Sequence, residues 1–141
     1  MSVLTSGTAR GTIIATFEGG GGVIGHSRGT VVQISQVYST IQVSVYSPND
    51  VGGIIGCNTG PISMGIDNVY TNAKLFGSSS AGGIYGATSF NATKISNSYS
   101  CITSNATIDS GMIVGCSTTS SKVTGTNVFY CNETMVPATG T

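Results

Sequence analysis

The sequence predicts an all-β chain that folds as a β-solenoid (β-helix) of about four coils, each of roughly 30 residues with three short strands. Two unrelated motifs repeat along the chain with one shared period, which is the strongest of the observations behind this prediction. Short runs of Ile and Val alternate with glycine, and this pattern favours strands broken by tight turns. No segment has the apolar i, i+3, i+4, i+7 spacing of an amphipathic helix.

The first motif is a glycine-rich turn followed by two apolar residues and another glycine. It occupies residues 21–25, 52–56 and 82–86, and a degenerate copy with Met112 in place of one glycine occupies 111–115. The closing glycines stand at 25, 56, 86 and 115, so the successive steps are 31, 30 and 29 residues. A turn that recurs at this interval marks one supersecondary unit, which must stack on its neighbours to bury its apolar face.

The second motif ends on an aromatic residue and carries an amide two residues earlier. The aromatic residues are Tyr38, Tyr70, Tyr99 and Phe129, and the amides are Gln36, Asn68, Asn97 and Asn127. Coils stacked at the strand spacing of about 4.8 Å place equivalent residues in columns. We therefore expect an aromatic ladder and a hydrogen-bonded amide ladder, with asparagine adopting the left-handed backbone of a corner.

A third, weaker segment follows each aromatic residue and completes the coil. It occupies residues 41–45, 73–75 and Ile102, and residues 11–17 resemble it. The predicted organisation is a single domain, 1–141, that begins with a partial coil at 9–20. The four coils that follow span about 21–51, 52–81, 82–110 and 111–136.

Residues 52–60 and 66–70, with their counterparts in the other coils, resemble the GLUG motif, which has the approximate form G-G-L-V-G-x-N-x-G…I-x-N-x-Y-x-x-G-x-V. The resemblance extends over about residues 11 to 131, with Ile where the motif usually has Leu. It implies a non-catalytic segment of a large surface-exposed or secreted microbial protein, in a group that includes peptidases and adhesins. It supplies no catalytic residues.

The charge of the chain excludes several classes of partner. Only 7% of the residues are charged, and 5 basic residues balance 5 acidic ones. Nucleic-acid binding needs a basic stripe, as does binding of a basic helix to a membrane surface, and neither is present. The apolar runs are also too short to span a membrane. We expect no nucleic-acid partner and no membrane span.

The location is inferred from the repeat type rather than from a leader. The first ten residues lack the basic and apolar regions of a signal peptide. The signal is then trimmed away, or the chain is a fragment, or it is exported by another route or not at all. An extracellular or cell-surface location is the expectation.

The cysteines fall into two predicted columns. Cys101 and Cys131 both lie two residues past an aromatic residue, so their Cα atoms should be about 5 Å apart in adjacent coils. This pair forms a disulfide or packs as two small thiols. Cys57 and Cys116 share a second column with Ala87 between them, and at two rungs they are too far apart to bridge.

Three Asn-x-Thr triplets are potential glycosylation sites. They begin at Asn91, Asn105 and Asn132, and they matter only if the chain is secreted from a eukaryotic cell. In a chain so rich in Ser, Thr and Asn, such triplets also arise by chance.

The sequence offers no catalytic site, no metal site and no cofactor site. Glu18, Asp50 and Asp109 precede the glycine turns and could share one corner, where they form a solvated turn or a weak cation site. His26, in the column of Cys57 and Cys116, has no triad partner at a telling spacing. The run Gly19–Gly22 is a turn, because no Lys-Ser or Lys-Thr follows it as in a phosphate loop. An enzyme is therefore not expected.

The leading functional hypothesis is a structural or adhesive repeat module. Its partners are further copies of itself, joined laterally or end to end into a filament, or surface proteins and glycans. The alternative is a carbohydrate-binding module, or a non-catalytic segment of a secreted enzyme. Carbohydrate binding would use exposed aromatic residues outside the main ladder, for which the candidates are Tyr46, Tyr85, Phe90 and Tyr130. The other interpretation is that these residues pack in the core or against the corners.

Overall fold

The structure is a computed structural model, and it describes most of the chain. The described ranges are 2–4, 7–15, 19–28, 31–45, 50–59, 63–76, 80–88, 92–105, 109–117 and 122–131. Within these ranges the secondary structure consists of strands β1 to β20, with no helix. The chain is therefore all-β, as the short Ile and Val runs predicted.

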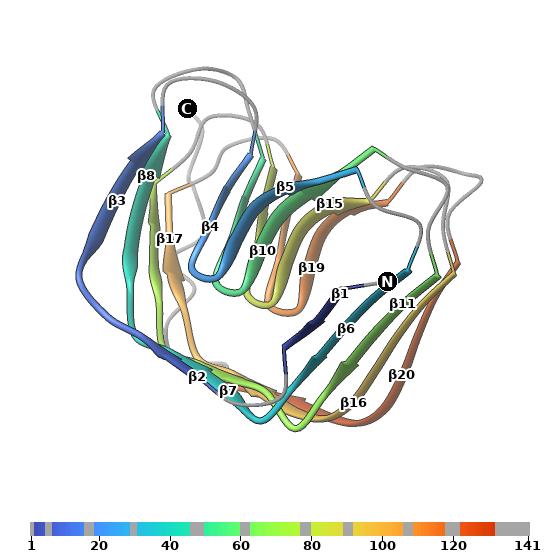
Figure 1. Cartoon of the computed structure of the whole chain (residues 1–141). Coiled ribbons are helices and arrows are strands. Elements are labelled where there is room, and N and C mark those ends of the chain that lie inside the picture. The colour runs from blue at the N-terminus through green and yellow to red at the C-terminus, as the bar shows by residue number, and fades with distance from the viewer. Residues whose placement is uncertain are drawn as a thin grey trace.

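The strands form four parallel sheets, called A to D (Figure 1). Sheet A contains β1 (Ser2–Leu4), β2 (Gly7–Ala9), β6 (Val31–Ser35), β7 (Val37–Ser39), β11 (Ser63–Asp67), β12 (Tyr70–Thr71), β16 (Ala92–Ser100) and β20 (Lys122–Tyr130). Sheet B contains β3 (Thr12–Ala15), β8 (Gln42–Val45), β13 (Lys74–Phe76) and β17 (Thr103–Ser104). Sheet C contains β4 (Gly20–Gly21), β9 (Val51–Gly52), β14 (Ser80–Gly82) and β18 (Asp109–Gly111). Sheet D contains β5 (Ile24–Ser27), β10 (Ile55–Asn58), β15 (Tyr85–Thr88) and β19 (Val114–Ser117).

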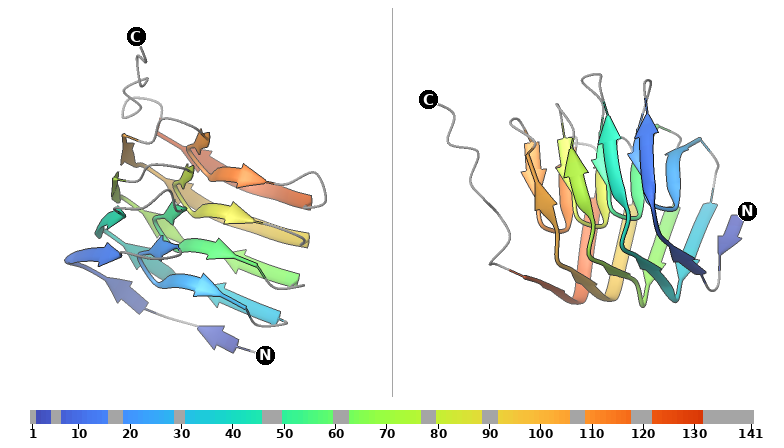
Figure 2. Two further views of the ribbon diagram at one scale, coloured as in Figure 1. Left: turned by 90° about the horizontal axis from the view of Figure 1, so that it is seen from above. Right: turned by 90° about the vertical axis from the view of Figure 1, so that its left-hand side faces the viewer.

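One pass of the chain through sheets A, B, C and D is called a circuit. Each strand pairs in parallel with the equivalent strand of the next circuit, so that Ile66 has Ile34 on one side and Ile95 on the other. The circuits lie on one another in chain order from the N-terminal to the C-terminal end (Figure 2). The sequence period of the two motifs therefore equals the number of residues that separates register partners in the sheets.

Two details of the predicted coils were wrong. The first circuit begins before residue 9, because β1 and β2 pair with β6 and β7. This part of the circuit was missed because Thr8 stands where the later circuits have an aromatic residue. A circuit also has more than three strands, since the glycine-rich segments form the short strands of sheet C. Residues 132–136 of the predicted last coil lie outside the described residues.

Close approach of the backbone explains the glycine motif. A Cβ atom on Gly52 would fall far inside van der Waals distance of the Ile55 carbonyl oxygen, and the equivalent glycines meet the same obstacle. The closing glycine Gly56 faces the carbonyl oxygens of Gly25 and Gly20, at 2.5 and 2.6 Å from an added Cβ. Sheets C and D can therefore approach this closely only where the chain has no side chain.

Aliphatic columns fill the interior between the sheets. One cluster joins the inner faces of sheets A and D, and it includes Ile34, Ile66 and Ile95 as one column and Ile54 and Ile84 as another. A second cluster, against sheets B and C, includes Val43, Leu75 and Ile102. Burial of each such side chain contributes about 1.5–3 kcal/mol, so the stacked columns provide the main stabilisation of the fold.

The amide residues form the bend within sheet A. Gln36, Asn68, Asn97 and Asn127 have φ values of 55°, 55°, 47° and 52°, the only positive values among the described residues other than glycine. Asparagine tolerates this left-handed conformation better than other residues with a side chain. The bend turns the aromatic residue two positions later outward, in the same way in each circuit.

Candidate functional site

The aromatic residues predicted to be neighbours are register partners along the outer face of sheet A. Tyr70 pairs with Tyr38 and Tyr99, and Tyr99 pairs with Phe129. The Tyr38 and Tyr70 rings lie 4.7 Å apart at 24°, and the Tyr70 and Tyr99 rings lie 5.3 Å apart at 2°. We call these four residues the aromatic ladder. The ring faces of Tyr70 are thus covered by its neighbours, whereas Phe129 is 64% exposed.

The amide ladder runs beside the aromatic ladder. The Asn127 amide donates a hydrogen bond to the Asn97 side-chain oxygen at 3.1 Å, and Asn97 in turn donates to the Asp67 carboxylate at 3.0 Å. Ser96 donates to the same carboxylate oxygen at 2.7 Å. The hydrogen bonds of this ladder therefore connect three successive circuits, although Asp67, which precedes Asn68, accepts the bond from Asn97.

A surface hollow lies between the two ladders near the C-terminal end. It has a volume of about 370 Å³, and Asn97, Ser98, Tyr99, Asn127 and Phe129 line it. An exposed aromatic ring beside amide groups is an arrangement that can hold a sugar or another neutral polar ligand. Of the surfaces described, this hollow is the candidate binding site.

The candidates for carbohydrate contact outside the ladder have different surroundings. Tyr85 is fully buried in the core, so of its two alternatives the structure supports core packing and excludes sugar contact. Tyr85 occupies the same column as Ile24, Ile55 and Val114, which belongs to the apolar cluster between sheets A and D. Tyr130 is 55% exposed. Tyr46 and Phe90 lie outside the described residues.

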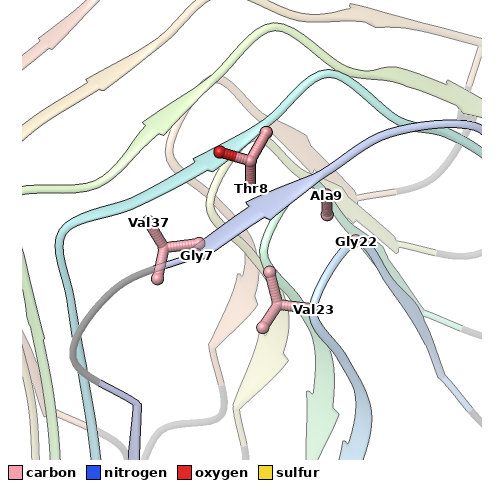
Figure 3. Close-up of a pocket in the computed structure, with 6 residues that line it drawn as sticks. All are labelled: Gly7, Thr8, Ala9, Gly22, Val23 and Val37. Carbon is pink, nitrogen blue, oxygen red and sulfur yellow. The ribbon is translucent and has the colours of Figure 1, made fainter.

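A second hollow opens at the N-terminal end of the stack (Figure 3). Gly7, Thr8, Ala9, Gly22, Val23 and Val37 line a space of about 280 Å³. Gly7 occupies the column position that Val37 fills in the next circuit, so the hollow is the space of a missing side chain. The described residues of its lining carry one hydroxyl group, that of Thr8, and no charged side chain.

A column of buried hydroxyl groups escaped the sequence prediction. Ser39, Thr71 and Ser100 are register partners and are fully buried. Within the described part of the chain, their hydroxyl oxygens have no hydrogen-bond partner. Each oxygen lies against the second glycine of a turn, namely Gly22, Gly53 or Gly83. The sequence does contain a signal for this column, because a serine or threonine directly follows each of the ladder tyrosines Tyr38, Tyr70 and Tyr99.

The two cysteine columns have the predicted neighbours. Ala87 pairs with Cys57 on one side and with Cys116 on the other, and Cys57 pairs with His26. The Cys101 amide donates to the Thr71 carbonyl and the Cys131 amide donates to the Ser100 carbonyl, at 2.8 and 2.9 Å. Cys101 and Cys131 therefore occupy equivalent places in adjacent circuits. All four cysteines are thiols in the structure, so the disulfide between Cys101 and Cys131 stays a prediction.

Oxidised glutathione should convert Cys101 and Cys131 to a disulfide, as one glutathione disulfide takes up two electrons and two protons to become two thiols. We expect a mass lower by two hydrogen atoms, and a gain of about 3 kcal/mol in unfolding free energy from closing the loop between these residues. Mass spectrometry and urea unfolding measure the two effects. Cys131→Ser should abolish both effects, and the double variant Cys57→Ser, Cys116→Ser should keep both. A bridge that survives Cys131→Ser would contradict the prediction.

Burial and the Cys101 and Cys131 thiols raise the pKa values of the neighbouring Tyr70 and Tyr99 side chains. Burial raises the pKa of Tyr70 above its usual 10.0, as do negative charges that form on Tyr38, Cys101 and Cys131. Burial, the same two sulfur atoms and hydrogen bonds to them raise the pKa of Tyr99. Two thiols and two phenols thus share one side of sheet A.

The raised phenol pKa values predict a loss of stability in alkali. Unfolding releases Tyr70 and Tyr99 to ionise near their usual pKa of 10.0, whereas the folded chain keeps them neutral to a higher pH. Their contribution is fully present below about pH 10 and falls as the pH rises above it. Urea unfolding at about pH 9 and about pH 11 measures the change. The double variant Tyr70→Phe, Tyr99→Phe should show a smaller loss, and an equal loss would contradict this assignment.

The remaining predicted site residues give no assembled centre. Asp50 and Asp109 occupy one column with Ser80 between them, whereas Glu18 lies outside the described residues. The Asn105 side chain is exposed, and Asn91 and Asn132 also lie outside the described residues. Among the described residues, no three His, Cys, Asp or Glu side chains cluster as metal ligands would. No helix in the described ranges has the length and hydropathy needed to cross a membrane.

Comparison of the chain with protein-family models, with curated proteins and with solved structures found no match.

Proposed function

We propose that the chain is a β-solenoid that serves as a non-catalytic structural or adhesive repeat module at a cell surface or outside the cell. The observation that carries this proposal is the continuous parallel register of the circuits, in which each sheet pairs equivalent residues about one period apart. Each repeat in such an array is stabilised by contacts with its neighbouring repeats, so the array can be lengthened by adding further repeats. The GLUG resemblance stays a prediction that agrees with this role.

The outer surface supports contact with partners rather than chemistry. Exposed positions of sheet A carry neutral polar side chains such as Gln33, Asn68 and Asn97. The chain has zero formal net charge. The partners proposed for this surface are surface proteins, glycans or the outer faces of other copies, because neutral hydrogen-bonding groups suit all three.

Removing one whole repeat tests the modular architecture. Gly52 and Gly82 are register partners, so deletion of residues 53–82 joins equivalent positions of two circuits. The shortened chain should fold cooperatively, with β-type circular dichroism and lower stability. The matched control deletes residues 53–67, about half a period, and should not fold. If the two deletions behave alike, the solenoid proposal fails.

Adhesion is tested with beads coated with the chain and passed over immobilised glycans and extracellular proteins. Retention under flow above that of beads coated with an unrelated β protein supports the adhesive role. Retention on none of the surfaces would leave only a spacer role, and turnover of any glycan or peptide would overturn the non-catalytic assignment.

The hollow between the ladders favours carbohydrate binding as a second candidate function. Phe129 is the one ladder residue with a largely exposed ring, and Asn97 and Asn127 lie beside it. A sugar would stack on the Phe129 ring and accept hydrogen bonds from the amides. Phe129→Ala should then abolish any binding on a glycan panel, while Gln33→Ala, at another exposed site of sheet A, should leave it unchanged. No binding by the parent chain would dismiss this candidate.

A further inference from the structure

A polar groove lies on the outer surface at the corner between sheets A and B, where β2 and β7 lead into β3 and β8 (Figure 1). Its volume is about 440 Å³, and it is lined by Gly11, Thr40, Gln42, Asn72, Lys74 and Thr103. These residues come from four successive circuits, so the groove runs along the axis of the stack. It shares no residue with the hollow beside Phe129 or with the hollow at the N-terminal end.

Two columns of side chains form the sides of the groove. Gln42, Lys74 and Thr103 are register partners in sheet B and form one column. Thr40 and Asn72 belong to the other, since each directly follows a member of the hydroxyl column. From the first circuit to the fourth the lining covers three strand spacings, or about 14 Å along the stack. The groove is therefore long enough for a chain of several units rather than a single small molecule.

Buried side chains beneath the groove fix its shape. Ile41, Ala73 and Ile102 lie between the two columns in the sequence, and they are buried in the cluster of sheets B and C. Their neighbours on either side therefore face outward, as alternation in extended backbone requires. A ligand would meet groups whose backbone is already ordered, so binding would cost little conformational entropy of the protein backbone.

The backbone amides of the groove are already hydrogen-bonded. Those of Thr40, Gln42, Asn72, Lys74 and Thr103 each donate to a carbonyl oxygen of the preceding circuit, at 2.8 to 3.1 Å. An extended peptide cannot pair with these amides as an added strand. Recognition is therefore left to the side chains, which provide two hydroxyl groups, two amides and one ammonium group.

The charge of the groove favours an anion. Lys74 is exposed, and it is the only charged residue among the described residues of the lining. Arg10, directly before Gly11, adds an exposed positive charge at the N-terminal end of the groove. An ammonium group with no carboxylate beside it in this lining attracts an anionic group of a ligand.

The composition of the lining narrows the class of anion. Heavily sulfated chains are recognised by clusters rich in Lys and Arg, and this lining has a single lysine. A neutral sugar usually stacks on an aromatic ring, and none of the described lining residues is aromatic. One ammonium group among neutral hydrogen-bonding groups matches a ligand with one carboxylate among many hydroxyl groups.

We propose that this groove binds a chain of uronic acid units, with the carboxylate of one unit on the Lys74 ammonium group. The hydroxyl groups of the sugar rings exchange hydrogen bonds with the Gln42 and Asn72 amides and with the Thr40 and Thr103 hydroxyl groups. This inference rests on the glycan-binding part of the proposed function, and it names the class of glycan and the place where it binds.

Titration of the nitrogen-15-labelled chain, followed by NMR under reducing conditions, measures the binding. The ligand is a hexamer of β-1,4-linked glucuronic acid. The matched ligand is cellohexaose, which has the same linkage and a hydroxymethyl group in place of each carboxylate. A sulfated cellohexaose and an oligomer of glutamic acid test the other two classes of anion.

Two variants lose one positive charge each. Lys74→Gln copies Gln42 of the same column, and Lys94→Gln copies Gln33 of its own column on the outer face of sheet A. Both lysines are exposed, and each new side chain already occurs at the equivalent place in another circuit. Circular dichroism verifies that both variants keep the fold.

The glucuronate hexamer should shift the amide signals of the groove residues. Lys74→Gln should raise its dissociation constant roughly fivefold or more, because a charge-assisted hydrogen bond becomes a neutral one. Lys94→Gln should change the dissociation constant by less than about twofold. Cellohexaose should bind more weakly than the glucuronate hexamer by a similar factor to that lost in Lys74→Gln.

Several results would overturn the proposal: no binding of the glucuronate hexamer, equal affinity for cellohexaose, equal effects of the two variants, or signals that shift only beside Phe129. Tighter binding of the glutamate oligomer or of the sulfated ligand would also overturn it and assign the groove to that class. The bead assay for adhesion includes proteins and neutral glycans and does not depend on Lys74, so the two proposals fail separately.

Discussion

Replacement of Gly52 by alanine is expected to lower the unfolding free energy by about 3 kcal/mol or more, or to prevent folding. The added methyl group would overlap the Ile55 carbonyl oxygen, and the Gly86 amide nitrogen lies 2.8 Å from its Cβ position. Both obstacles are backbone atoms of strands β10 and β15 in sheet D, so neither can rotate away. Urea unfolding followed by circular dichroism measures the loss.

The matched control for Gly52→Ala is Gly125→Ala. A Cβ atom on Gly125 would meet only the Val128 side chain, at 3.4 and 3.8 Å, which is ordinary contact. Alanine is also the better residue in a strand interior, so the stability should change by less than about 1 kcal/mol. Equal losses in the two variants would show that the close approach of sheets C and D is not what demands glycine.

Replacement of Ile66 by alanine is expected to cost about 2–5 kcal/mol. Ile66 is 1% exposed and lies between Ile34 and Ile95 in the central column. The neighbours on both sides are fixed by the sheet register, so they cannot close the cavity that the shorter side chain leaves. Denaturant unfolding gives the free energy difference.

Lys94→Ala is the control for Ile66→Ala, because Lys94 lies on the same sheet and its side chain is exposed. Its stability should stay within about 0.5 kcal/mol of the parent chain. A loss of less than about 1 kcal/mol for Ile66→Ala would mean that the interior repacks freely, contrary to the column packing described above.

The repeating features of the fold were predictable because a repeat records its register in the sequence. Tyr70 and Tyr99 are one repeat period apart in the sequence, and they are register partners in sheet A. The aromatic ladder could therefore be inferred from the sequence spacing of the aromatic residues. The left-handed corners followed from the chemistry of asparagine. The position of Cys101 beside Cys131 followed from the same count.

The features that were missed depend on contacts between segments of different type. For Tyr85 the sequence left sugar contact and core packing open, because its burial depends on which side of β15 faces the interior. Ser100 follows the aromatic motif and Gly83 belongs to the glycine motif, and their side chain and backbone pack together. The period of each motif says nothing about how the two motifs lie relative to each other. Thr8 stands where the later members of its column are aromatic, so the first strands of sheet A were not recognised from the sequence.

The constant register has a consequence for the kinetics of folding. Ile34 with Ile66, Tyr70 with Tyr99 and Ser80 with Asp109 are each separated by about one period. None of the described strands pairs with a segment more than about one period away in the chain. Loop-closure entropy is then similar for every circuit, whatever the length of the array. A chain that emerges from the ribosome can add each circuit to the one before as soon as one more period has been synthesised.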